Sequence, residues 1–127
     1  MVTIVDKILE QNGKIERDIS RIGTLDNGEI CSEIISKLRT FVEHIAMYHY
    51  VQKNSLKNEV TQNNVTAGIP FINKDKELSF ISRLHKCLQV CASHYVISEV
   101  TSPRLIQKYL PYLLKIKIWL KATYGIN

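Results

Sequence analysis

The chain has 127 residues, of which 45% are hydrophobic and 23% charged, values typical of one globular domain with its own core rather than of a disordered chain. Only five glycines and three prolines are present, which disfavours many short strands joined by tight turns, and no apolar run approaches the roughly 18 residues of a membrane span. The net charge of +5 is uneven, because residues 1–60 contain eight basic and nine acidic side chains whereas residues 61–127 contain nine basic and three acidic ones.

Two amphipathic helices are predicted in the first half of the chain. The first runs from about Val2 to Ile22, where isoleucines recur at helical spacing. A turn follows at residues 24–28, and either of its polar residues Asp26 and Asn27 can cap the next helix. The second helix runs over about residues 29–53. Its apolar stripe contains Ile30, Ile34, Leu38, Phe41, Val42 and Ile45.

The middle of the chain is predicted to be irregular. Residues 54–76 are rich in asparagine and contain Gly68 and Pro70, so we expect a long loop with at most a short helical turn. A third helix is predicted over about residues 77–98. The face that it buries contains Phe80, Ile81, Leu84, Cys87, Leu88, Cys91 and Tyr95.

A fourth helix is predicted at the end of the chain. Ser102 and Pro103 have the order of an N-cap followed by a first helical residue. The helix continues to about Tyr124, with a kink expected at Pro111 and a stop at Gly125. Four helices of this length indicate a bundle.

The predicted fold class is therefore all-α, a four- to five-helix up-and-down bundle. Residues 1–127 form a single domain, either complete or the N-terminal domain of a longer protein. The three cysteines Cys31, Cys87 and Cys91 fall in helical patterns, and their odd number suits buried free thiols in a reducing compartment. Charged residues interrupt the apolar N-terminus, unlike in a signal peptide. We expect a cytoplasmic protein without a membrane partner.

The motifs of several enzyme classes are absent from the sequence. There is no phosphate-binding glycine loop, dinucleotide fingerprint or metalloprotease helix. Cys87 and Cys91, with His85 and His94 nearby, are a weak candidate for a metal site, because a second pair of ligands at zinc spacing is missing. A core role for both cysteines fits better, and we expect neither a metal ion nor another cofactor.

The second helix contains the most informative segment, LRTFVEH at residues 38–44. This segment resembles the R-x4-6-H motif of HEPN domains, which are small four- or five-helix bundles and often dimeric. The resemblance implies a metal-independent endoribonuclease of a toxin–antitoxin, phage-defence or RNA-processing system, with Arg39 and His44 as catalytic residues. Nuclease members of the family often have Asn, Asp or His directly after the arginine. This chain has Thr40 there, which retains a hydroxyl group.

Both residue types suit RNA cleavage by the 2′-hydroxyl. A histidine titrates near neutrality and can transfer protons, and an arginine can bind phosphate oxygens as negative charge develops. Five residues of helix turn the chain by about 500°, so Arg39 and His44 point about 140° apart. Glu43, one turn after Arg39, is the natural helix partner of the arginine. A joint catalytic role is thus expected to need a second helix or subunit.

Four further side chains are candidates for binding RNA. Tyr48 and His49 follow the motif and can stack on bases, or can belong to the core. Lys108 and Lys115 in the fourth helix can bind an RNA backbone, or can form an ordinary solvated face. The expected partners are RNA, a second copy of the chain, and an antitoxin or fused domain.

The competing hypothesis is a non-catalytic helical module of a larger protein, used for dimerisation or for binding RNA or protein. It predicts no turnover, and a His44 that is either hidden in the core or far from any groove, and under it Arg39 can simply pair with Glu43. The nuclease hypothesis predicts that Arg39 and His44 face a positive cleft at a two-fold interface.

Overall fold

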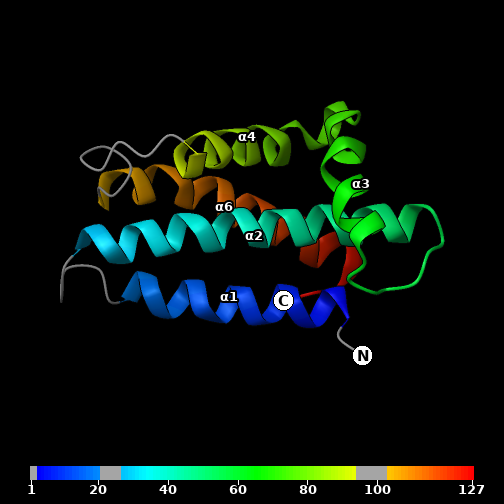
Figure 1. Ribbon diagram of the computed structural model, residues 1–127, viewed down its shortest axis with the longest axis horizontal. Coiled ribbons are helices and arrows are strands. Elements are labelled where there is room, and N and C mark those ends of the chain that lie inside the picture. The colour runs from blue at the N-terminus through cyan, green and yellow to red at the C-terminus, as the bar shows by residue number, and fades with distance from the viewer. Residues whose placement is uncertain (1–2, 21–26, 94–102) are drawn as a thin grey trace.

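The computed structural model describes residues 3–20, 27–93 and 103–127 (Figure 1). These residues form α-helices and one short 3-10 helix, and none of them forms a strand, which confirms the predicted all-α fold. The elements are α1 (Ile4–Ser20), α2 (Asn27–Lys53), α3 (Gln62–Asn73), η1 (Lys76–Leu78), α4 (Ser79–Ser93) and α6 (Pro103–Tyr124). No helix in the described part of the chain combines the length and the apolar character needed to span a membrane.

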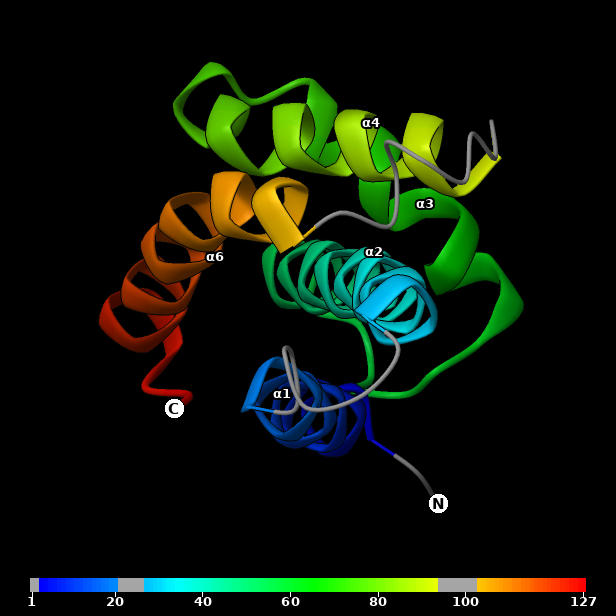
Figure 2. The same ribbon diagram turned by 90° about the vertical axis from the view of Figure 1, so that its left-hand side faces the viewer.

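The long helices are arranged around α2. Figure 1 shows α1 and α4 running in one direction and α2 and α6 in the other, which is the up-and-down order of a bundle. Figure 2, a view turned by 90°, shows α2 enclosed by α1, α3, α4 and α6. Helix α3 crosses the bundle instead of running along it.

The predicted apolar stripes form the core. In α1, Ile4, Ile8 and Ile15 are buried. The buried members of the α2 stripe are Ile34, Leu38, Phe41, Val42 and Ile45. Burial in α2 extends to residues outside that stripe, including Ala46 and Met47, because other helices pack on several sides of α2.

The first helix begins at Ile4, two residues later than predicted, because a local capping arrangement fixes its start. The Thr3 hydroxyl accepts a hydrogen bond from the Asp6 backbone N–H at 3.1 Å, and the Asp6 carboxylate accepts one from the Thr3 N–H at 3.3 Å. This reciprocal pair satisfies two donors at the helix start. The side-chain oxygen of Asn58 accepts a third hydrogen bond, from the Ile4 N–H at 2.9 Å.

The prediction of a long loop over residues 54–76 is wrong, because this region contains α3 and η1. Thr61 caps α3, and its hydroxyl accepts from the Asn64 N–H at 3.1 Å. Helix α3 then packs against α2 through buried Gly68 and Ile72. Tertiary packing and one cap therefore outweigh the low helix propensity of the asparagine-rich segment.

The bounds of the last helix agree with the prediction. Pro103 is the first residue of α6, and the helix continues through Pro111. Gly125 has φ +69°, and its N–H donates to the Lys121 carbonyl at 2.8 Å, the geometry of a glycine helix stop. The caps predicted at Asp26 and Ser102 lie outside the described residues.

Candidate functional site

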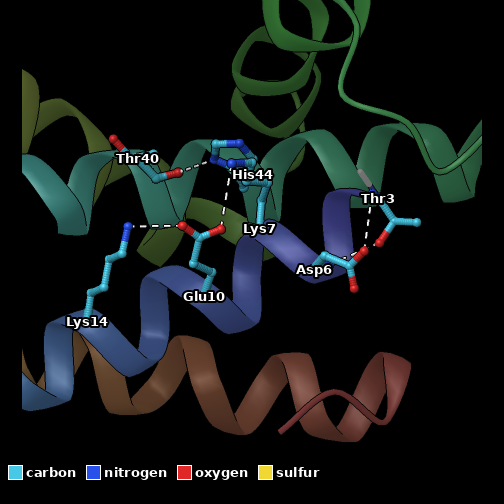
Figure 3. A network of polar contacts seen from close by, with 7 residues as sticks. All are labelled: Thr3, Asp6, Lys7, Glu10, Lys14, Thr40 and His44. Carbon is cyan, nitrogen blue, oxygen red and sulfur yellow. Dashed lines mark hydrogen bonds and ion pairs between the residues drawn. The ribbon is translucent and has the colours of Figure 1, made fainter. Parts of the chain in front are cut away.

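His44 lies half-buried on α2, with one ring nitrogen held by the main chain (Figure 3). Its Nδ1 is 2.7 Å from the carbonyl oxygen of Thr40. A carbonyl can only accept, so Nδ1 carries the hydrogen and donates it. In the neutral ring the lone pair therefore resides on Nε2. This is the tautomer in which Nε2 is the nitrogen that can accept a proton.

The first helix packs on α2, and three of its charged side chains form a network of ion pairs. Figure 3 shows Lys7, Glu10 and Lys14 of α1 together with Thr40 and His44 of α2. The Glu10 carboxylate lies 2.9 Å from the Lys14 ammonium and 3.6 Å from that of Lys7. The hydrogen bond and charge of Lys14, followed by the charge of Lys7, lower the pKa of Glu10. This carboxylate is thus engaged by two lysines of its own helix.

Arg39 forms no ion pair with the described residues. It is half-buried, and its Nε is fully buried without a hydrogen bond. The expected ion pair with Glu43 is therefore not formed, although the charge of Arg39 helps to lower the pKa of that carboxyl. Because the guanidinium of arginine is always charged and has five N–H donors, an arginine in this state can still bind an anionic group.

Glu43 instead contacts α4. Its Oε2 accepts a hydrogen bond from Nε2 of His85 at 2.9 Å, and the His85 side chain is buried while that of Glu43 is 40% exposed. This hydrogen bond lowers the pKa of Glu43 more than burial raises it. His85 also lines a hollow of about 480 Å³ beside α3. The sequence gives no signal for this pair, because the two residues meet only through the packing of α2 on α4.

Arg39 and His44 belong to different sides of α2. Glu43, one turn from Arg39, contacts α4. Lys37, two turns before His44 and so on nearly the same face, forms an ion pair with Asp18 of α1. The described residues contain no hydrogen bond or ion pair between Arg39 and His44. The charges of both residues nevertheless help to lower the pKa of Glu43, so within one chain they act on the same neighbouring carboxylate without a hydrogen bond or ion pair between them.

His49 is buried in an aromatic cluster rather than placed beside His44. Its Nδ1 lies 2.6 Å from the Tyr124 hydroxyl, and its ring centroid is 5.3 Å from that of Trp119 and 5.8 Å from that of Phe71. Tyr48 is half-buried and packs edge-on against Tyr124 at 5.0 Å. These contacts join α2, α3 and α6, so the core alternative for His49 is the one that the geometry favours.

The burial of His49 predicts a pH-dependent stability. Burial, assisted by the charge of Lys53 and opposed by that of Asp75, lowers the pKa of His49. The unfolded chain then binds a proton more readily than the folded chain, so the free energy of unfolding is expected to fall as pH drops from 7.5 through about 6.5 towards 5. Urea unfolding at several pH values measures this fall. In His49→Phe it is expected to be smaller, and an unchanged pH profile in that variant would contradict the assignment.

Lys108 and Lys115 lie apart from the motif. Both are exposed on α6 and line a groove between α6 and α4. Cys87 of α4 is exposed and lines the same groove, so the expectation that this thiol is buried is wrong. The helix α4 buries Ile81 and Leu88 instead, and this turns Cys87 outwards. The side chains of the other two cysteines lie outside the described residues.

The described residues contain no group of three histidine, cysteine, aspartate or glutamate side chains that could hold a metal ion. Their candidate chemistry consists of the His44 imidazole, the Arg39 guanidinium and the Glu43–His85 pair. Comparison of the chain with known proteins finds no matching family model, no matching curated protein and no matching solved structure.

Proposed function

We propose that this protein is a metal-independent endoribonuclease of the HEPN type. The proposal rests above all on the hydrogen bond from His44 Nδ1 to the Thr40 carbonyl, which leaves Nε2 as the basic nitrogen of a half-buried histidine. The guanidinium of Arg39 supports it, because this group is only half-buried and forms no ion pair with the described residues, so it can bind a phosphate without first breaking one. The resemblance of residues 38–44 to the family motif supplies the reaction class.

In the proposed reaction, Nε2 of His44 removes the proton of an RNA 2′-hydroxyl. The 2′-oxygen attacks the adjacent phosphorus, and the bond from phosphorus to the 5′-oxygen breaks. Arg39 stabilises the additional negative charge on the phosphate oxygens, and the leaving 5′-oxygen takes up a proton. The products are a 2′,3′-cyclic phosphate and a 5′-hydroxyl end.

A homodimer completes the proposed site. Because Arg39 and His44 occupy different sides of α2, we propose that the arginine of one subunit acts with the histidine of the other across a two-fold axis. The biological setting implied by the resemblance, a toxin or phage-defence system with an antitoxin or fused partner, is part of the same proposal.

Incubating the protein with single-stranded RNA in EDTA tests the proposed function. We expect cleavage products with cyclic phosphate ends, identified by mass spectrometry, and a rate about 10² to 10⁴ lower in His44→Ala, as is usual when a general base is removed. Gln52→Ala is the matched control. Gln52 is an exposed residue of the same helix outside the motif, so the cleavage rate of this variant is expected to stay close to that of the unaltered protein. Equal rates for His44→Ala and the unaltered protein would reject the proposal.

The second candidate function is a non-catalytic module that binds RNA or a partner protein. The separation of Arg39 from His44 within one chain and the engagement of Glu43 by His85 favour it. Binding of RNA without any cleavage in the same experiment, in EDTA and in magnesium, would support this function over the nuclease.

A further inference from the structure

A basic groove with a volume of about 720 Å³ lies between α4 and α6. Four of the described residues that line it are cationic, and none is acidic. Arg83 and Lys86 come from α4, and Lys108 and Lys115 come from α6. Basic residues that the sequence places far apart thus meet in one hollow, and the groove accounts for a large share of the positive charge in the second half of the chain.

The groove cations are available to an anionic ligand. Arg83, Lys86 and Lys108 are exposed, and none forms an ion pair with the described part of the chain. Lys115 lies with its ammonium 4.7 Å from the centre of the Phe80 ring. A phosphate entering the groove would therefore replace water and counterions instead of competing with a protein carboxylate.

Aromatic side chains in the groove favour an unpaired strand as the ligand. Tyr112 lines the groove and is 45% exposed, and Phe80 is half-buried beneath Lys115. An exposed aromatic ring beside cations can stack on a base while the cations bind the phosphates. In a duplex the bases already stack on one another, so a duplex offers this groove its phosphates alone.

We propose that the groove between α4 and α6 is a binding site for single-stranded RNA, with Tyr112 stacking on a base. The choice of RNA as the ligand rests on the proposed nuclease function. The location of the site rests on the cations and aromatic rings that line the groove. Arg83 and Lys86 also line the hollow beside His85, on the other side of α4. The basic surface therefore continues over α4 towards the Glu43–His85 pair, and it can guide a strand from the groove to α2.

The experiment measures binding separately from cleavage. Fluorescence anisotropy with a labelled single-stranded RNA is recorded at several salt concentrations in a His44→Ala background, which the proposed chemistry makes inactive. Arg83→Gln with Lys86→Gln is expected to weaken binding at least about tenfold and to reduce the slope of log K against log salt by about 1.4, the value for two lost phosphate contacts on a single strand. Tyr112→Ala is expected to weaken binding about tenfold.

The matched control is Lys57→Gln with Lys74→Gln, which removes the same charge from exposed positions outside the groove. Unchanged binding in this control supports the site, and an equal loss overturns it. Tighter binding of duplex RNA, or equal binding of single-stranded DNA of the same sequence, overturns the assignment to single-stranded RNA. If the groove variants lose binding while the unaltered protein never cleaves RNA, the nuclease is rejected and the binding site stands.

Discussion

A heterodimer of the Arg39→Ala and His44→Ala subunits is expected to cleave RNA at about half the rate of the unaltered homodimer, although each variant alone is expected to be inactive. The reason is geometric. Arg39 and His44 occupy different sides of α2 and share no contact in the described chain. If one site takes its arginine from one subunit and its histidine from the other, this heterodimer retains one intact site of two.

Co-expression with two different affinity tags yields the heterodimer in pure form, and its cleavage rate is measured in EDTA. The control is a heterodimer of the unaltered subunit with the double variant Arg39→Ala/His44→Ala. If the sites are shared between subunits, one site of that control lacks its arginine and the other lacks its histidine, so the control is expected to be inactive.

If each site instead lies within one subunit, the results expected for the two heterodimers are reversed. The control would then retain half of the activity, and the heterodimer of single variants would have none. Such a result would reject the shared site and leave the nuclease assignment intact. A protein that elutes as a monomer in size-exclusion chromatography with light scattering would also contradict the shared site.

The sequence predicted the long helices because their apolar residues recur at helical spacing. Buried Ile8, Leu38 and Ile45 illustrate this, since each belongs to a predicted stripe. Helix α3 was missed because its residues have low helix propensity, and because Pro70 lies inside it. Its formation depends on contacts with α2, which no local pattern encodes, and on the cap at Thr61, a local signal that is too weak alone to outweigh the low propensity of the segment.

The candidate site was predicted in part. The helical conformation of residues 38–44 was predicted, and with it the angle of about 140° that helical geometry sets between Arg39 and His44. The pairing of Glu43 was wrong, because a local i,i+4 partner was expected and the carboxylate instead contacts His85 on another helix. The sequence indicated Lys108 of α6 as a candidate for binding RNA. It did not indicate Arg83 and Lys86 of α4, because only the tertiary structure brings them to the same groove.

Replacing Gly68 with alanine is expected to destabilise the protein by about 1–3 kcal/mol, the usual cost of overpacking a core. A β-carbon at this position would lie 2.8 Å from the backbone nitrogen of Met47 and 3.1 Å from the carbonyl carbon of Ala46. These are backbone atoms of α2, and that helix is fixed by α1, α4 and α6. The clash can therefore be relieved only by moving α3 away, and Gly68→Val should cost more than Gly68→Ala.

Gly13→Ala is the matched control, because Gly13 also lies inside a helix but a β-carbon there meets nothing within 4 Å. This change is expected to stabilise the protein by about 0.5–1 kcal/mol through the lower entropy of the unfolded chain and the better helix propensity. Both substitutions have the same effect on the unfolded state, so the difference between their free energies of urea unfolding isolates the clash between α3 and α2. Equal stabilisation by both would show that α3 does not pack closely on α2.

Because α3 also provides Phe71, which lies against His49, a displaced α3 in Gly68→Ala should let water reach that histidine. The pH dependence of the free energy of unfolding should then be weaker in this variant.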